Sequence, residues 1–280
     1  MISPLFAGLT VFYLWPIVQT LYFSFTEWGP FGGSTWTGLD NYRRLLGDDE
    51  VRRAIWNTLR FTFFSLAGVP IAVTFAAMLN QKGVRGVGLY RALFFIPVVT
   101  LPAAVAMVWG YLLNGDFGIV NYVLSLGGID GPSWLADPTF ALYALVVVGV
   151  WSSIGYNIII LLAGLQTIPR QLYEASALDG AGQVRQFFSV TVPMLSPSIF
   201  FVTVLSVIGS LQMFDLVYVM VGRTSPALAS TQTIIYLFYE QGFVQNDRGY
   251  AAAIVLVLLL LVLGMTLLQF RLQRRWVHYA

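Results

Sequence analysis

Long apolar runs, separated by short polar stretches, dominate the pattern of the chain. Each run holds roughly 20 residues, the length that an α-helix needs to cross a hydrocarbon core of about 30 Å. Strands of a membrane barrel would instead alternate apolar and polar positions over about ten residues. The uninterrupted runs therefore predict an all-α membrane protein. Its six predicted transmembrane helices lie at residues 3–25, 57–79, 92–113, 141–164, 199–221 and 252–270.

The composition agrees with lipid as the main solvent of the chain. Hydrophobic residues make up 58% of it and charged residues 10%, a mix that a soluble protein could not cover with polar surface. Cysteine is absent and the single histidine is His278, which excludes disulfides, thiol catalysis and the usual Cys/His zinc sites. The first run lacks a preceding basic region and extends to Phe25, so it is interpreted as a retained span and not as a signal peptide. We expect the whole chain, 1–280, to form one transmembrane domain.

The distribution of basic residues bears on the orientation in the membrane, because cytoplasmic segments are richer in Lys and Arg. Counted over all segments, the two sides carry nearly equal numbers. The 80–91 turn and the tail after Phe270 nevertheless hold basic residues without any acid, whereas the 26–56 loop mixes its arginines with carboxylates. This local asymmetry favours a multi-pass topology with both termini in the cytoplasm. It also places residues 165–198, between the fourth and fifth spans, on the cytoplasmic side.

Residues 165–198 predict two short helices on the membrane surface. Pro169 is tolerated in the first turn of the first helix, and Gly180 is its predicted stop. The second helix is expected over 183–191 and to end at Pro193. An amphipathic connector that rests on lipid headgroups would show the same pattern. The residues alone therefore leave open whether another protein docks on this loop.

One motif in this loop carries a family resemblance. It consists of Glu174-Ala175-Ser176, three residues, Gly180, nine residues and then Val190-Thr191-Val192-Pro193. This arrangement resembles the E-A-A loop of permeases from binding-protein-dependent ABC importers, with Ser for the second Ala and Val for both Ile and Leu. Further stretches that resemble the carbohydrate branch, which includes maltose and glycerol-3-phosphate permeases, are 38–42, 56–58, 163–169, 214–218 and 249–253. The loop 222–226 departs from the Gly-Gly-Gly-Pro run that is usual in the family.

The resemblance implies a type I ABC importer permease fold in a bacterial inner membrane, with this chain supplying half of the translocation pathway. The implied partners are a second, related permease, two cytoplasmic ATPase subunits, an extracytoplasmic solute-binding protein and membrane lipid; a nucleic acid is not expected. By the same resemblance, the first short helix docks in a cleft of the ATPase, with Glu174 facing a basic residue and Gly180 permitting the turn. The residues expected to couple the chain to the ATPase are Glu174, Ala175, Ser176, Asp179, Gly180 and Pro193.

The chain is not expected to be an enzyme. A nucleotide-binding P-loop needs the pattern G-x4-G-K-[ST], whereas the only lysine, Lys82, lies between Gln81 and Gly83. We therefore expect no cofactor on this chain and assign ATP and Mg²⁺ to the partner ATPase subunits. An ion-coupled secondary transporter is the main alternative, but it would carry titratable groups deeper in the bundle and often a repeat. An intramembrane enzyme would need a nucleophile and a base inside the spans, so neither catalytic nor metal-binding residues are predicted.

Polar and aromatic residues inside the fourth and fifth predicted spans mark a candidate solute pathway, because unpaired polar groups are costly in lipid. The resemblance to maltose-type permeases places solute contacts on the same two helices. Aromatic faces with amides and hydroxyls suit a sugar or a sugar-like solute such as glycerol-3-phosphate, while Ser and Gly also serve close helix packing. The predicted pathway residues are Trp151, Gly155, Tyr156, Asn157, Ser206, Ser210, Gln212, Met213 and Asp215. Asp215 is the only carboxylate within a predicted span, and a structural or gating role is expected for it.

Overall fold

The computed structural model describes residues 2–28, 33–81 and 86–277, so the features noted at Lys82 and His278 lie outside the described residues. Most of the described chain is helical. The α-helices are α1 Ser3–Leu9, α2 Trp15–Phe23, α3 Asp40–Gly47, α4 Asp49–Ser65, α5 Gly68–Leu79, α6 Val87–Val99, α7 Pro102–Leu112, α8 Ile119–Leu126, α9 Ala141–Gln166, α10 Arg170–Leu178, α11 Gln183–Gln186, α12 Val192–Leu211, α13 Leu228–Thr231, α14 Ile234–Tyr239 and α15 Arg248–Gln273. Turns of π-helix lie at Thr10–Leu14, Phe187–Thr191, Val217–Val221 and Glu240–Val244. An antiparallel hairpin is formed by β1 Thr26–Trp28 and β2 Ser34–Trp36, with Thr26 opposite Trp36.

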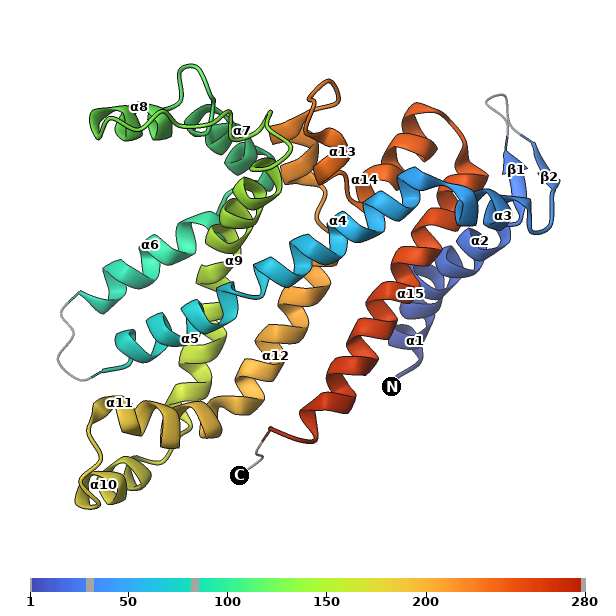
Figure 1. The fold of residues 1–280 in the computed structure, drawn as a ribbon. Helices are drawn as coiled ribbons and strands as arrows, with labels where there is room; N and C mark the ends of the chain where they lie inside the picture. The colour runs from blue at the N-terminus through green and yellow to red at the C-terminus, as the bar shows by residue number, and fades with distance from the viewer. Residues whose placement is uncertain (1, 29–32, 82–85, 278–280) are drawn as a thin grey trace.

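Several of these helices join into membrane spans. The helical segments of the described chain that are long and apolar enough to cross a bilayer are Ser3–Phe23, Asp49–Leu79, Ala141–Gln166, Gln183–Leu211 and Arg248–Gln273, and the bent pair of α6 and α7 supplies a sixth candidate. Figure 1 shows α7, α8 and α13 at one end of the molecule, here named the α8 end, and α10 and α11 at the opposite end, the α10 end. The predicted helical membrane fold is confirmed, although the second, third and fifth spans begin at least five residues before their predicted starts.

The fourth span, α9, contacts α4, α5, α6 and α12 and so forms the centre of the bundle. Two glycines let it approach its neighbours closely. A Cβ at Gly155 would overlap the backbone oxygen of Phe94 in α6, and one at Gly164 would overlap the Ser198 side chain in α12. Gly155 can carry a side chain only if the backbone of α6 moves, and a side chain at Gly164 would displace the side chains of Ser198 and Leu195.

The third span is not the single helix predicted at 92–113. It consists of α6 and α7, whose axes meet at 101°. Thr100 and Leu101 between them have extended backbone, with ψ of 143° and 128°. Pro102 accounts for the bend, because a proline ring disfavours helical backbone at the residue before it. In a membrane, such irregular backbone is tolerated only where it is covered by protein or lines a cavity.

The second span begins before its predicted start at residue 57 and is broken in its middle. Asp48 caps α4, because its carboxylate accepts a hydrogen bond from the Glu50 N–H at 2.8 Å. The helix ends at Ser65, and α5 resumes at Gly68. The second span therefore consists of two helical halves that meet near its centre.

The fifth span differs most from its prediction at 199–221. α11, the following π-helical turn and α12 form one continuous helix, Gln183–Leu211. The predicted second surface helix therefore does not end at Pro193, and this prediction is wrong. Pro193 instead lies in the first turn of α12. One helix thus extends from the loop before the span to the break after Leu211.

The two prolines of α12 are accommodated in different ways. Pro193 follows a π-helical turn, where the hydrogen-bond ladder already changes its spacing. Pro197 lies inside the helix and has no N–H for the carbonyl of Pro193. The Ser196 hydroxyl donates to that carbonyl at 2.6 Å and so replaces the missing bond. The helix continues because a neighbouring side chain satisfies the orphaned acceptor.

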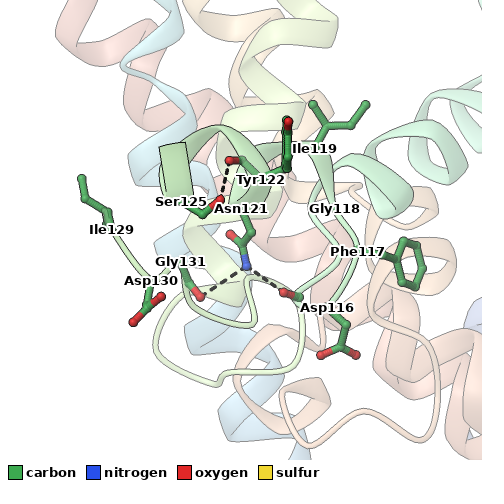
Figure 2. A pocket seen from close by; sticks show the side chains of 11 residues that line it. Asp116, Phe117, Gly118, Ile119, Asn121, Tyr122, Ser125, Ile129, Asp130 and Gly131 are labelled. Atoms are coloured by element: carbon green, nitrogen blue, oxygen red, sulfur yellow. Dashed lines mark hydrogen bonds between the residues drawn. The ribbon is translucent and has the colours of Figure 1, made fainter. Parts of the chain in front are cut away.

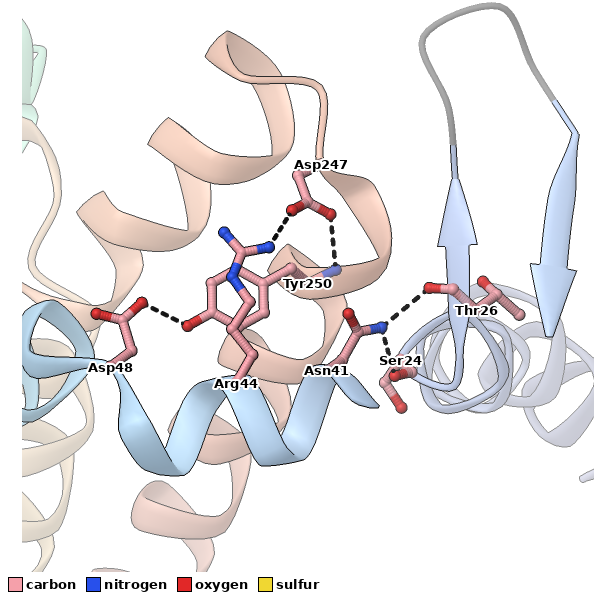
Figure 3. A network of polar contacts seen from close by, with 7 residues as sticks. All are labelled: Ser24, Thr26, Asn41, Arg44, Asp48, Asp247 and Tyr250. Carbon is pink, nitrogen blue, oxygen red and sulfur yellow. Dashed lines mark hydrogen bonds and ion pairs between the residues drawn. The ribbon is translucent and has the colours of Figure 1, made fainter. Parts of the chain in front are cut away.

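A polar network joins the second and sixth spans at the α8 end (Figure 3). The Tyr250 hydroxyl in α15 donates to the Asp48 carboxylate at 2.6 Å, and the Arg44 guanidinium lies 3.8 Å from the centre of the Tyr250 ring. Arg44 also pairs with Asp247 at 2.6 Å. Burial raises the pKa of the Asp48 carboxyl, but hydrogen bonds from Tyr250 and from backbone N–H groups outweigh burial and hold that pKa below its ordinary value.

Asn41 in α3 extends this network to the end of the first span. Its amide donates to the carbonyls of Ser24 and Thr26, both at 3.0 Å. Gly249 approaches the same strand, since a Cβ there would overlap the carbonyl oxygen of Thr26. The stretches around Asn41 and Gly249, which carried part of the family resemblance, therefore meet in space and hold three spans together.

The chain between the fifth and sixth spans forms further helices that the sequence analysis did not predict. The Asn57 amide in α4 donates to the carbonyls of Ala229 and Gln232 at 3.0 and 3.2 Å. The Thr58 hydroxyl accepts a hydrogen bond from the Ile234 N–H at 3.0 Å. Side chains of the second span thus satisfy backbone groups that the short helices α13 and α14 leave unpaired.

Candidate functional site

A cavity of about 610 Å³ lies where the second, third, fourth and fifth spans meet. Small-molecule sites in proteins commonly measure about 300–1,000 Å³. Its wall combines apolar and neutral polar side chains, and Asp215 is the one charged residue among the described residues that line it. The lining comes from Phe61 and Ser65 of α4, from the bend between α6 and α7, from α9 between Gly149 and Asn157, and from the chain between Leu205 and Leu216.

The cavity brings together most of the predicted pathway residues. Those that line it are Tyr156, Asn157, Ser206, Ser210, Gln212, Met213 and Asp215. Trp151 lies instead against Trp109 of α7, with ring centroids 5.4 Å apart in an edge-on arrangement. Gly155 packs against the backbone of α6 at Phe94. A role of Trp151 and Gly155 in contacting solute stays a prediction, and their position in this chain is that of helix packing.

Hydrogen bonds across the cavity wall fix α9 against α12. The Asn157 amide donates to the Ser206 hydroxyl at 3.4 Å, and Asn157 is almost fully buried. The Ser210 hydroxyl donates to the Ser206 carbonyl of its own helix at 2.6 Å. Within the described chain, the Tyr156 hydroxyl and the Gln212 amide have no such partner, so both are free to bind a solute hydroxyl.

Asp215 does not lie inside a continuous helix, contrary to the prediction. α12 ends at Leu211, Met213 and Phe214 are non-helical, and Asp215 begins the next helical turn. The Thr233 hydroxyl donates to the Met213 carbonyl at 2.8 Å and satisfies an acceptor that the break exposes. The exposed Asp215 carboxylate therefore stands at a broken helix beside the cavity, the kind of arrangement that membrane transporters use at solute sites.

The predicted surface helix exists as α10, at the α10 end. Gly180 has φ +78°, and the Ala181 N–H donates to the Ser176 carbonyl at 3.0 Å, while the Gly180 N–H donates to the Ala177 carbonyl at 3.0 Å. This pair of bonds is the Schellman motif, which ends a helix at a left-handed residue. The predicted stop at Gly180 thus has a defined backbone geometry.

α10 is tied to the start of the fifth span. The Tyr173 hydroxyl lies 3.0 Å from the Thr191 hydroxyl, and the Gln186 amide donates to the Tyr173 carbonyl at 3.3 Å. The opposite face of the loop is open: Glu174 is exposed, and Leu178 is 90% exposed. Among the described residues, Glu174 forms no ion pair. The loop therefore presents an acid and an apolar side chain on a surface that its own contacts hold in place.

The remaining predicted coupling residues fall into two groups. Ala175, Asp179 and Gly180 are exposed on α10 or just after it, and Ser176 is half-buried beside them. Pro193 is separate from this surface, because it belongs to the first turn of α12. The structure thus groups five of the six predicted residues on one short stretch, Glu174–Gly180.

A second, more polar cavity of about 450 Å³ lies at the α8 end, along α8 and the loop after it (Figure 2). Asn121 holds this loop closed. Its amide donates to the carbonyls of Gly115, Gly131 and Pro132 at 2.9, 3.3 and 3.1 Å, and its oxygen accepts from the Trp134 ring N–H at 2.6 Å. Because this single amide makes four hydrogen bonds, the loop is an ordered part of the surface opposite α10.

Sequence reasoning missed the contribution of the second and third spans to the central cavity. Ser65 and Phe61 lie at the break in the second span, and Thr100 lies at the bend in the third. The signal that could have found them is a proline inside an apolar run, namely Pro70 and Pro102. Such prolines interrupt helices, and an interrupted helix inside a membrane points to a cavity.

Comparison with known proteins shows the family of the chain. The sn-glycerol-3-phosphate transport system permease protein UgpA of Pectobacterium atrosepticum is 36% identical over 274 residues, covering 96% of this chain and 91% of that protein. The probable ABC transporter permease protein YesP of Bacillus subtilis is 36% identical over 285 residues, covering 99% of this chain and 90% of that protein.

A solved structure shares the fold. It is that of a bacterial alginate ABC transporter in complex with an alginate pentasaccharide-bound periplasmic protein, with a TM-score of 0.86 and 22% identity over 98% of this chain and 93% of that one. The family described as binding-protein-dependent transport system inner membrane component matches residues 52–278. The chain therefore belongs to the inner membrane components of binding-protein-dependent ABC transport systems.

Proposed function

We propose that this permease forms half of the pathway of an ATP-driven importer for a sugar or a sugar-like solute, and that the loop containing α10 transmits the work of a partner ATPase to the central cavity. The observation that carries the proposal is the continuity between loop and cavity. α9 provides one wall of the cavity and leads into α10 through Thr167–Pro169 alone. The uninterrupted helix Gln183–Leu211 leads from the loop to the opposite wall.

A displacement of α10 would therefore move both walls. Hydrogen bonds of Tyr173 join α10 to the start of the fifth span, so a shift of the loop would displace that helix as well. Helices act as rigid levers over such lengths, because their backbone groups are paired internally. ATPase closure would open the cavity toward the α8 end, and hydrolysis would return it toward the α10 end.

The chemistry of the cavity supports a polyhydroxylated solute. Free hydroxyl and amide groups at Tyr156 and Gln212 can hydrogen-bond to solute hydroxyls, while Met213 and Phe214 supply apolar surface for ring faces. The names of the relatives agree with this class of solute, since UgpA is a glycerol-3-phosphate permease and the alginate transporter carries a polysaccharide.

The proposed assembly contains a second, related permease, two ATPase subunits and a binding protein that delivers solute at the α8 end. The α10 end is then cytoplasmic, and both termini lie on that side. The exposed Glu174 and Leu178 suit a protein partner better than lipid, because an unpaired acid would meet anionic headgroups unfavourably. ATP and Mg²⁺ would be bound by the ATPase subunits.

Reconstituted vesicles test the proposal. The complete complex is placed in vesicles with ATP on the α10 side and binding protein on the α8 side, and uptake of labelled maltose, glucose, glycerol and sn-glycerol-3-phosphate is measured in turn. Uptake of at least one of these solutes that requires both ATP and the binding protein is the expected result. Uptake that a proton or sodium gradient drives without ATP would contradict the proposal and favour a secondary transporter.

A further inference from the structure

Ser65, on the second span, differs from the other hydroxyl residues of its helix. Its hydroxyl is buried in the cavity wall and has no hydrogen-bond partner among the described residues. Thr58 and Thr62 of the same helix donate to the carbonyls of Ala54 and Thr58, at 2.7 and 2.8 Å. Such bonding to the preceding turn is the usual way in which a helix satisfies a hydroxyl that lacks water.

Ser65 lies at a break in the second span, which a proline follows five residues later. Pro70 has no N–H for the carbonyl of Leu66, and the ladder tightens here: the Ala67 N–H bonds to the Phe64 carbonyl at 3.1 Å and the Val69 N–H to the Leu66 carbonyl at 3.0 Å. Ser65 is the last residue of α4 before this break. The break lies near the centre of the second span, which is the depth at which transporters place their solute sites.

The other serine and threonine hydroxyls of the cavity are already engaged. Those of Thr100, Ser152, Ser153 and Ser210 donate to carbonyls of their own helices, at 2.8, 2.8, 3.2 and 2.6 Å. Ser206 is bonded by the Asn157 amide. Ser65 is therefore the one hydroxyl among the described serines and threonines of the wall that neither donates nor accepts a hydrogen bond within the chain.

A buried hydroxyl without a partner disfavours folding, so its presence in a cavity wall needs a compensating role. Proteins retain such local costs at functional sites. Met213 and Phe214 line the same cavity and are only half-buried, so its wall offers apolar surface as well as a free hydroxyl. That combination suits a molecule that has both apolar faces and hydroxyl groups.

We propose that Ser65 contacts the transported solute, that its hydroxyl hydrogen-bonds to a solute hydroxyl, and that the second span thereby contributes to specificity together with α9 and α12. The inference rests on the proposed importer function and extends it to a third helix.

Two alanine variants separate this role from a structural one. Ser65→Ala removes the free hydroxyl, and the control Thr74→Ala removes a hydroxyl of the same span that bonds to the Pro70 carbonyl and does not line the cavity. The complete complex in vesicles is supplied with binding protein, and the probe is whichever of maltose, glucose, glycerol and sn-glycerol-3-phosphate the wild type takes up fastest with ATP. KM and kcat of uptake, co-purification of the ATPase and the solute-free melting temperature are measured for each.

Ser65→Ala is expected to raise KM by about threefold to tenfold, the effect of one neutral hydrogen bond, while ATPase co-purification stays unchanged. Its melting temperature without solute should equal or exceed that of the wild type, because an unpaired buried hydroxyl is removed. Thr74→Ala should change KM less than about twofold, because Thr74 does not line the cavity. The inference would be overturned if Ser65→Ala changed KM by less than about twofold, if KM rose equally in both variants, or if Ser65→Ala lowered the melting temperature below that of the wild type. None of these outcomes contradicts the proposed importer function. That proposal would be contradicted only if the wild type showed no ATP-dependent uptake.

Discussion

Gly155→Ala is expected to destabilise the protein through one contact between α9 and α6. The added Cβ would overlap the backbone oxygen of Phe94, lie 2.7 Å from its carbonyl carbon and lie 3.3 Å from a methyl group of Val98. Carbon atoms prefer about 3.5–4.0 Å, so the α6 backbone would have to move by roughly 1 Å. Overpacking of this kind costs about 1–3 kcal/mol, and the better helix propensity of Ala returns only about 0.5–1 kcal/mol. The net expectation is a loss of about 1–2 kcal/mol.

The matched control for this change is Gly264→Ala in α15, where a Cβ would meet no atom within 4 Å. Both variants make the same substitution inside a long helix, so only the packing differs. Thermal unfolding of the detergent-purified chain, followed by tryptophan fluorescence at one heating rate, should show a melting temperature lower by about 2–6 °C for Gly155→Ala. Gly264→Ala should match the wild type or exceed it slightly.

Equal melting temperatures of Gly155→Ala and Gly264→Ala would refute the packing argument. The same experiment bears on the sequence-based assignment of Gly155 to the solute pathway. If Gly155→Ala is as stable as the control yet impairs uptake, Gly155 contacts solute and the helix-packing interpretation is wrong.

Further changes test the polar network, the cavity and the turn after α10. Tyr250→Phe should lower the free energy of unfolding by about 1–2 kcal/mol at pH 7, because it removes a hydrogen bond from a fully buried tyrosine to a carboxylate. Unfolding of the wild type and the variant, measured at pH 7 and again in acid, checks this expectation and the next one. Because the pKa of the Asp48 carboxyl is lowered in the folded state, its contribution to stability is present above about pH 4 and is lost as the pH falls through that lowered pKa. The difference in unfolding free energy between the wild type and Tyr250→Phe should therefore shrink in acid. A difference that stays constant with pH would contradict this. Asn157→Ala should raise the KM of uptake by about threefold to tenfold and more than Trp151→Ala does, because only Asn157 lines the cavity; the reverse order would assign the solute contact to Trp151. Gly180→Val should weaken ATPase co-purification, because a β-branched residue at φ +78° costs about 1–2 kcal/mol, whereas Gly180→Asn should be tolerated; identical behaviour of both would show that this turn geometry is irrelevant.

The features that the sequence predicted correctly rest on local signals. Apolar runs of membrane length identify the helices, since lipid leaves few alternatives for a backbone without water. The stop of α10 at Gly180 was predictable because a left-handed residue after a helix is a local demand that glycine meets best. The E-A-A motif identified the loop because it is a contiguous pattern in the sequence.

The features that the sequence did not reveal depend on tertiary contacts. The fifth span was placed at 199–221 because apolar residues continue beyond Leu211, whereas the break there is stabilised by Thr233, which bonds to the Met213 carbonyl from a distant part of the chain. Pro193 marked a helix end in the sequence, but it follows a π-helical turn and lies in the first turn of α12, so the helix continues.

The sequence also did not show in which direction the side chains of one helix point. Trp151 and Asn157 lie on the same span, yet packing turns one toward Trp109 and the other toward the cavity. The polar and aromatic residues of the fourth span are clustered at 151–157 and surround the helix on all sides, so the sequence does not show which face is buried against protein and which faces solute. The contributions of Ser65 and Thr100 were missed because the second and third spans were predicted as continuous helices in spite of Pro70 and Pro102.

The central claim is that α10 couples this permease to an ATPase, and a charge reversal tests it most directly. Glu174→Lys changes the exposed acid of α10, and Glu27→Lys makes the same change on the exposed strand β1 near the opposite end. Breaking an interfacial charge pair costs about 2–5 kcal/mol, so Glu174→Lys should reduce ATPase co-purification from detergent by at least about tenfold, while Glu27→Lys retains it. Wild-type co-purification of the ATPase with Glu174→Lys, together with wild-type ATP-driven uptake, would show that α10 is only a surface connector.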